Sequence, residues 1–530
     1  MQFATVRRAS RDDSTLSESG RRISPPVAEL LGIVLAVALT LCVVSHLAQT
    51  QAWMLYADGD SVLNVLTSKS ILLGQRQDWA MSPVLFLPES AVYGALSLLG
   101  LGVRATLTLN AVLNFFALYA ALRVASGSRA MNQLPVAGAL WAFGLFCALS
   151  LLEGGSNSGG FQLASLLATT TYYSSTIITA ILTVGVVRRG LATDRPQLWP
   201  TVSGLVVLCG VSALTNPLYL GWTTVPAAGV LALLAITGKA RPRSALTFGT
   251  AIALGSLLGY FGRGLFSGTV VADSRNYVRP GNVGGSFQLY GGLLQQMATT
   301  LPGALWCLVL AIVLAIAVQQ LRRAWRTGDS SLAFVSLIAV AAPIVATAGA
   351  VLLGTVAQRY LQPWVFMPVL GLVAIPSQLA SALSGLGRRI VVTIALGTVA
   401  VTLLASAIAV PPMIAVASTT DVDLSCVVKW VERSGRTGAG QFWVARAPKA
   451  YIADPSRVIQ VDNKFNPYTW LTNRTDLDHA KVSFLIEGDP MVPWAFPAGF
   501  DQNSGRRISC GRYSILDFGT ASIPLGIPHS

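Results

Sequence analysis

Apolar stretches as long as a membrane span recur along most of this chain and stop near residue 410. A helix that crosses a bilayer needs about 20 mostly apolar residues. Eleven segments meet this requirement, near 27–49, 105–122, 134–152, 167–187, 199–215, 219–237, 244–262, 301–320, 332–353, 361–383 and 390–410. The pattern predicts a polytopic α-helical membrane protein.

A further apolar segment, 84–101, is interrupted by Pro88 and Glu89. We interpret it as a re-entrant or interfacial helix, because proline and a carboxylate both disfavour a continuous helix inside a bilayer. This interpretation gives about 11 crossings. If the region around 84–122 is divided differently, the count becomes 12 or 13.

The character of the chain changes at Pro411, after which charged residues are frequent and apolar runs shorten to strand length. Residues 411–530 are therefore expected to form a small water-soluble α/β domain. We expect a helix at 424–434 and strands at 440–446, 457–461, 481–486 and 512–517. Cys426 and Cys510 bracket this domain, and they can form a disulfide in an oxidising compartment.

Charge strengthens the membrane interpretation. Only 11% of the residues are charged, against about 25% in ordinary soluble proteins, which excludes a cytosolic enzyme or a disordered chain. The formal net charge is +14, and 18 of the 25 basic residues before position 411 lie in the tail 1–26 and in five short connectors. Basic loops favour the cytoplasm. We therefore expect a cytoplasmic N-terminus and an extracytoplasmic C-terminal domain, and no nucleic-acid partner.

The acidic residues carry the strongest functional signal. Asp58 and Asp60 flank Gly59 directly after the first span, in a predicted first outer loop at 50–83. An Asp-x-Asp pair suits either a general base or oxygen ligands for a divalent cation. The sequence therefore leaves a metal requirement open, and a divalent cation is the one cofactor that it suggests.

Three motifs together resemble the GT-C superfamily of integral-membrane glycosyltransferases. The first is the acidic pair after the first span, followed by a Gly-x-x-x-Asp-Trp stretch from Gly74 to Trp79 and a Pro-rich entry to the next helix. The second is Arg359-Tyr360-Leu361-Gln362-Pro363, which is similar to an Arg-Tyr-x-x-Pro motif in several of these families. The third is the polar and aromatic stretch Thr169–Ser175 at the outer end of a span.

The resemblance is to the group that includes aminoarabinose, arabinofuranosyl and mannosyl transferases. It implies a GT-C-like fold in a bacterial inner (plasma) membrane, a polyprenyl-phosphate-linked sugar as donor and a cell-envelope glycan or glycolipid as acceptor. Arabinofuranose and mannose are the sugars that it suggests. It also implies that Asp58 or Asp60 is the catalytic base. The chain lacks the Asp-Glu pair of some families, so the choice between the two stays open.

A single base suits an inverting displacement, whereas a retaining mechanism needs a second, facing carboxylate. Arginine suits the phosphate of the donor, since its planar fork matches phosphate oxygens. The loop 262–300 is rich in glycine, aromatic residues and arginine. The candidate substrate-binding residues are charged or aromatic residues expected on the outer side: Lys69, Arg76, Asp78, Trp79, Glu153, Tyr172, Tyr173, Arg263, Arg275, Arg279, Arg359 and Tyr360.

Two other functions use many spans. A polysaccharide polymerase or ligase has a large outer loop with arginines, but an early acidic pair and a soluble C-terminal domain argue against it. A flippase or transporter usually places ionisable groups at the bilayer midplane and contains repeated halves. Here the acids cluster on the outer side, and no repeat is visible in the sequence.

Overall fold

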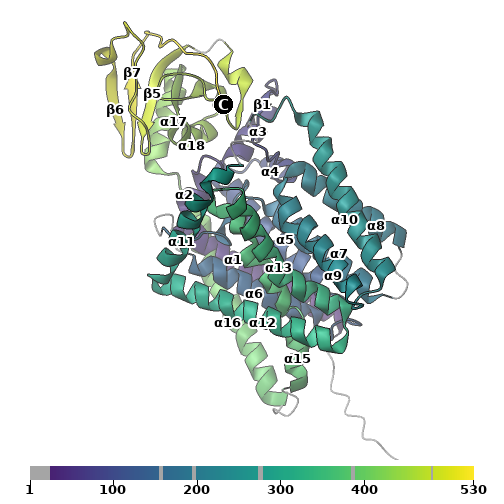
Figure 1. Ribbon diagram of the computed structural model, residues 1–530. Helices are drawn as coiled ribbons and strands as arrows, with labels where there is room; N and C mark the ends of the chain where they lie inside the picture. The colour runs from purple at the N-terminus through teal and green to yellow at the C-terminus, as the bar shows by residue number, and fades with distance from the viewer. Residues whose placement is uncertain (1–23, 154–158, 194–197, 272–277, 383–387, 479–480) are drawn as a thin grey trace, which may run out of the picture.

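The computed structural model describes residues 24–153, 159–193, 198–271, 278–382, 388–478 and 481–530. Its helices form a bundle, and a small domain that contains a sheet lies at one end of that bundle (Figure 1). Within the described residues, nine helical segments are long and apolar enough to cross a membrane. The fold is therefore that of a polytopic helical membrane protein with a small C-terminal domain.

Ten of the predicted spans correspond to helices: α1 (Pro25–Thr50), α5 (Val103–Ala125), α6 (Pro135–Leu152), α7 (Ser174–Ala192), α8 (Leu198–Thr215), α9 (Val225–Ile236), α10 (Pro242–Gly262), α12 (Leu301–Thr327), α13 (Ser330–Leu352) and α16 (Arg388–Ser418). The nine segments long enough to cross do not include α8 and α9, whose apolar parts, 199–215 and 220–236, are shorter. Local chemistry sets several of the ends. Thr300 caps α12 by accepting a hydrogen bond from the Gly303 amide, and Gly328, with φ of 73°, ends that helix.

The eleventh predicted span, 361–383, corresponds to Gln358–Leu379, one of the nine segments long and apolar enough to cross a membrane, but its backbone is not one continuous α-helix. It consists of α14 (Pro363–Phe366), a 3-10 segment at Pro368–Leu372 and α15 (Ile375–Ala382). Proline has no N–H to donate within a helix, so the two prolines break the backbone ladder. Hydropathy alone does not detect such breaks.

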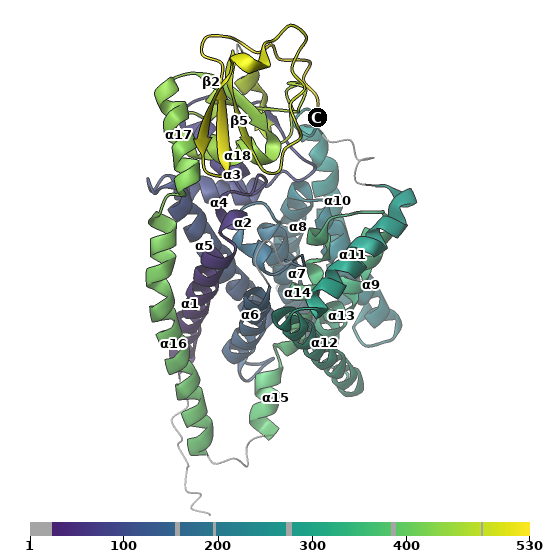
Figure 2. The same cartoon turned by 90° about the vertical axis from the view of Figure 1, so that its left-hand side faces the viewer.

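The segment 84–101 contains α4 (Leu87–Ser97), which has 11 residues. At 1.5 Å per residue such a helix is about 16 Å long, well short of the roughly 30 Å hydrocarbon core. With α3 (Leu63–Leu72) it lies between the bundle and the C-terminal domain (Figure 2). Its length supports a helix that does not span.

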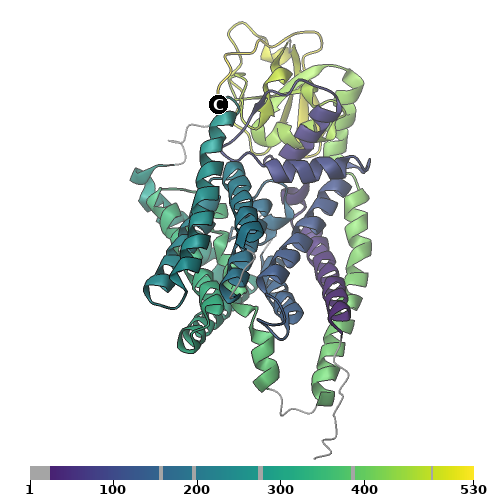
Figure 3. The same cartoon turned by 90° about the vertical axis from the view of Figure 1, so that its right-hand side faces the viewer.

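Helix α16 connects the bundle to the C-terminal domain. It runs beside α1, and the Ser45 hydroxyl donates to the Ala409 carbonyl at 2.8 Å (Figures 2 and 3). It continues through Pro411 and Pro412 to Ser418, so the helix ends later than the domain boundary expected at 411.

The C-terminal domain is a five-stranded sheet with two helices, α17 (Val422–Ser434) and α18 (Phe442–Tyr451). The strand order is β3-β2-β5-β7-β6, in which β3, β2 and β5 are parallel and β7 and β6 are antiparallel. The strands are β2 (Thr437–Gln441), β3 (Val458–Val461), β5 (Val482–Gly488), β6 (Arg506–Cys510) and β7 (Tyr513–Asp517).

The strand expected at 440–446 is wrong, because most of it belongs to α18. Residues 444–450 are all buried, so the run lacks the one-sided pattern of a surface helix. A short buried run of this kind does not distinguish a helix from a strand.

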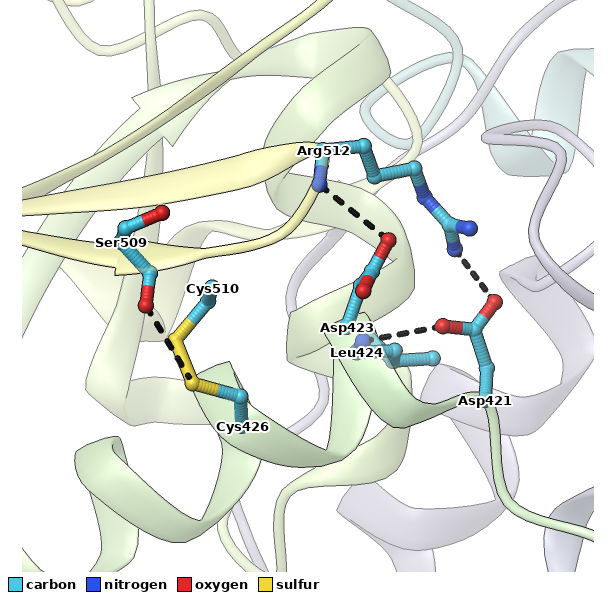
Figure 4. Close-up of a disulfide and its surroundings, with 7 residues drawn as sticks. All are labelled: Asp421, Asp423, Leu424, Cys426, Ser509, Cys510 and Arg512. Atoms are coloured by element: carbon cyan, nitrogen blue, oxygen red, sulfur yellow. Dashed lines mark hydrogen bonds and ion pairs between the residues drawn. A yellow bond between two sulfur atoms is a disulfide. The ribbon is translucent and has the colours of Figure 1, made fainter.

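Cys426 in α17 and Cys510 at the end of β6 form the disulfide expected from their positions (Figure 4). Arg512 strengthens the same junction. Its guanidinium donates to Asp421 at 2.6 Å, and its amide donates to Asp423 at 3.1 Å. The end of the sheet is thus attached to the start of α17, next to the point where α16 enters the domain.

Candidate active site

A cavity of about 580 Å³ lies where the helices meet the C-terminal domain. Its walls come from the loop after α2 (Ala52–Tyr56), from residues 82–86 and 171–173, from α10 and α13, and from residues 470–471 of the C-terminal domain. Six of the residues predicted from the sequence line it: Asp60, Tyr172, Tyr173, Arg263, Arg359 and Tyr360. These residues are spread over 300 positions of the chain, and the fold brings them together.

The charged pair in this cavity is Asp60 and Arg359. An Arg359 Nη1 lies 3.8 Å from Asp60 Oδ2, and the side chains are 31% and 18% exposed, respectively. The guanidinium also lies over the Tyr172 ring at 5.6 Å and the Tyr360 ring at 5.9 Å. Its Nε has no hydrogen-bond partner among the described residues. The cavity therefore contains a carboxylate next to a guanidinium that two tyrosine rings keep in place.

Asp58 has a different environment from Asp60. It is buried, it does not line the cavity, and its Oδ2 accepts three hydrogen bonds. The donors are the Ser61 amide and hydroxyl, both at 2.9 Å, and the Tyr172 hydroxyl at 3.1 Å. Burial, followed by the negative charge of Asp60, raises the pKa of Asp58 to about 6. The structure thus separates two acids that the sequence could not distinguish.

Two aromatic residues of the cavity wall adopt unusual backbone conformations. Phe86 has φ of 50° and Tyr173 has φ of 70°, in the left-handed region that residues other than glycine rarely adopt. Their rings are parallel, with centroids 6.4 Å apart. Such strained residues concentrate at functional sites.

Gln362 lies behind the cavity lining, and the sequence analysis included it in a motif but did not assign it a role. It is fully buried, and its Nε2 donates to the Leu163 and Tyr172 carbonyls, both at 3.3 Å. It therefore holds the segment that carries Tyr172. The only signal in the sequence was its place in the motif, three residues after Arg359.

The C-terminal domain contributes residues that are not among the predicted site residues. Trp470 and Leu471 line the cavity. Arg446 of α18 is fully buried, and its Nε donates to the Gly59 carbonyl at 2.9 Å. The sequence analysis placed Arg446 in a strand at 440–446 and gave it no role in the site. Arginine is rarely buried, and the residues near Arg446 in the sequence do not indicate a partner for it.

Four predicted substrate-binding residues lie outside the cavity lining and attach the 50–83 segment to the C-terminal domain. Lys69 Nζ donates to the Ile452 carbonyl at 2.7 Å, and Asp78 pairs with Arg474 at 2.7 Å. Trp79 belongs to β1 (Trp79–Ala80), which pairs antiparallel with β4 (Thr472–Asn473). The exposed Arg76 accepts from the Asn473 side chain through its carbonyl, at 2.8 Å.

The remaining candidates have separate environments. Glu153 is buried outside the cavity lining and accepts from the Ala164 and Ser165 amides, both at 2.8 Å, so it caps the 3-10 segment Ser165–Ala168. Arg263 lines the cavity, but its guanidinium donates to the Leu214 carbonyl at 2.7 Å and to the Pro83 carbonyl. Arg279 is exposed outside the lining, and Arg275 lies outside the described residues.

Asp58 and Asp60 do not form a metal site by themselves. In the part of the chain that the structure describes, no three His, Cys, Asp or Glu side chains gather in a way that would hold a metal ion. Asp58 Oδ2 already accepts three hydrogen bonds, so Asp60 is the one carboxylate of the pair that faces the cavity. One carboxylate is too small a donor set for a protein-only divalent-cation site.

Comparison with protein-family models and with curated proteins finds no match for this chain.

Proposed function

We propose that this protein is an inverting GT-C-type glycosyltransferase that moves a sugar from a polyprenyl-phosphate donor to a glycan or glycolipid acceptor. The observation that carries the proposal is the cavity in which Asp60 faces Arg359 at 3.8 Å. It combines the acid of the first motif with the arginine of the second.

In this proposal Asp60 is the general base. The acceptor hydroxyl attacks the anomeric carbon from the face opposite the phosphate and gives its proton to Asp60. The bond between that carbon and the phosphate oxygen breaks, and the polyprenyl phosphate leaves with the bonding electrons. Among the described residues, Asp60 is the one carboxylate that lines the cavity, which favours inversion over a retaining mechanism with two carboxylates.

Arg359 supplies the positive charge that a phosphate leaving group needs. Its planar fork suits phosphate oxygens, and the Tyr172 and Tyr360 rings hold it in place. Arg263 is the second arginine in the lining, but backbone carbonyls already occupy its guanidinium. We therefore assign the phosphate to Arg359.

The lipid part of such a donor needs an apolar path out of the cavity. Much of the lining is apolar, and it includes Val84, Leu218, Trp222, Val345, Ala346 and Leu353. Two lining residues, Tyr260 of α10 and Leu353 directly after α13, are 45% and 43% exposed. A polyprenyl chain would pass between α10 and α13 into the bilayer by this route.

The distribution of basic residues supports a cytoplasmic N-terminus and an extracytoplasmic C-terminal domain, and the resemblance implies a bacterial plasma membrane. The cavity would then open on the extracytoplasmic side, where envelope glycans are built. Arabinofuranose and mannose are the first sugars to test.

The test is transfer by purified protein in detergent, with a panel of labelled polyprenyl-phosphate sugars and crude envelope glycan as acceptor. Asp60→Asn should abolish transfer from the preferred donor. Asp454→Asn is the matched control, because it removes a carboxylate of the C-terminal domain outside the cavity lining. Full activity of Asp60→Asn would contradict the proposal. If no donor reacts with the wild type, polymerase and flippase activities become the functions to assay.

A further inference from the structure

Helix α18 of the C-terminal domain packs directly against the loop that carries the two acids. Arg446 is fully buried and donates from Nε to the carbonyl of Gly59, the residue between Asp58 and Asp60. From Nη1 it donates to the carbonyl of Leu471, which lines the cavity. One guanidinium thus joins the acidic loop to another wall of the cavity.

Other contacts from the same region hold the segment on both sides of this loop. The Tyr451 hydroxyl donates to the Tyr56 carbonyl at 2.9 Å, and Lys69 Nζ donates to the Ile452 carbonyl. Gly59 itself lies against α18, because a Cβ at this position would approach Phe442 Cε1 to 2.9 Å. The backbone of the acidic loop is therefore shaped by the C-terminal domain.

Arg446 also places a charge beneath the two acids. Burial lowers its pKa to about 10, against the opposing effect of the Asp60 and Asp58 charges, so it remains protonated at neutral pH. Its Nη2 is buried and has no hydrogen-bond partner among the described residues. A buried cation with an unsatisfied donor is costly, and fold stability alone does not account for it.

We propose that Arg446 is a positioning residue for the catalytic loop, and that through it the C-terminal domain sets the position and charge environment of Asp60. This inference rests on the proposed function, because it takes Asp58 to Asp60 as the catalytic loop. Arg446 itself does not touch the cavity.

The first test does not depend on transfer activity. A cysteine is placed at position 60 (Asp60→Cys), and the rate at which a water-soluble maleimide labels it is measured. The chain without this substitution gives the labelling of the native cysteines, which is subtracted. Arg446→Met should change the labelling rate several-fold. Lys449→Met is the matched control, because Lys449 is a buried cation of the same helix that binds Asp476 and the Val458 carbonyl instead of the loop. The proposal would be overturned if Asp60→Cys were labelled at the same rate alone, with Arg446→Met and with Lys449→Met.

The second test uses transfer kinetics with Asp60 intact. Arg446→Met should lower kcat at least tenfold, leave KM nearly unchanged and shift the acid limb of the pH–rate profile to higher pH, since a cation that favours the carboxylates is gone. Arg446→Lys keeps the charge but cannot bridge two carbonyls as a guanidinium does, so it should lower kcat without moving the limb. This variant carries the test if Arg446→Met does not fold.

The outcomes distinguish the two proposals. A changed labelling rate with no transfer from any donor by the wild type would support the positioning role and contradict the glycosyltransferase function. Equal losses of kcat in Arg446→Met and Lys449→Met, with unchanged pH profiles, would assign Arg446 a merely structural role.

Discussion

Replacing Asp58 by asparagine should make the protein more stable above pH 6 and less stable near pH 4. Asp58 is only 3% exposed, and its carboxylate lies near the charge of Asp60. The charged form of a buried acid is unfavourable. Asparagine has nearly the same shape and carries no charge, so the substitution isolates the cost of that charge.

The magnitude follows from the pKa of Asp58, which is raised from 3.8 to about 6. Two pKa units correspond to about 3 kcal/mol. The folded state holds the proton more tightly than the unfolded state, so stability falls as the pH rises from about 4 to about 6 and stays lower above that. The raised pKa already includes the hydrogen bonds that the charged form accepts from Ser61 and Tyr172. Asparagine avoids the cost of the charge, but it has an NH₂ group in place of one carboxyl oxygen, for which we allow a loss of roughly 1 kcal/mol at every pH. The variant should therefore gain about 2 kcal/mol at pH 8.

Thermal unfolding of wild type and Asp58→Asn in the same detergent, at several pH values between 4 and 8, measures this difference. The two stability curves should cross between pH 4 and pH 6. Asp454→Asn removes a carboxylate whose side chain is 38% exposed, and it should give no crossing. Parallel curves for wild type and Asp58→Asn would refute the reasoning about the buried charge.

Three further predictions concern the neighbourhood of the cavity and the C-terminal domain. Gly59→Ala should lower the transfer rate strongly and the free energy of unfolding by about 1–3 kcal/mol, because its methyl group would lie 2.9 Å from a carbon of Phe442. A Phe442→Leu change in the same chain should restore part of both. Arg359→Lys should lower kcat/KM for the donor at least tenfold without changing the unfolding midpoint, because an ammonium group cannot present the planar fork; an unchanged donor dependence would contradict this. Reduction of the Cys426–Cys510 disulfide, which closes a loop of 84 positions, should destabilise the C-terminal domain by about 4–5 kcal/mol, measurable as a lower first unfolding transition with reductant than without.

The sequence predicted the helices of the bundle well, because each is a long apolar run and the bilayer sets its length. It did not predict where the backbone of a span is irregular. The segment 361–383 is apolar throughout most of its length, yet Pro363 and Pro368 divide it into short helical pieces. Hydropathy records the apolar character of such a segment and not its hydrogen bonds.

The candidate site was predictable in part. Asp60, Tyr172 and Arg359 belong to short motifs that stand out in an apolar chain, and they meet in one cavity. The separate environments of Asp58 and Asp60 depend on tertiary contacts from Tyr172 and Arg359, which two acids one residue apart do not reveal. Arg446 could not be assigned to the site, because its partner Gly59 lies 387 positions earlier in the chain.

That separation also determines when the cavity becomes complete. A ribosome adds about 5–20 residues per second, so roughly 20 to 80 s pass between synthesis of the acidic loop and synthesis of the arginine beneath it. During this interval the loop has left the ribosome without Arg446, and β1 has no β4 with which to pair. A chain whose synthesis stops early would contain the helices but not the finished cavity. Closing the cavity is thus one of the last events in making this protein.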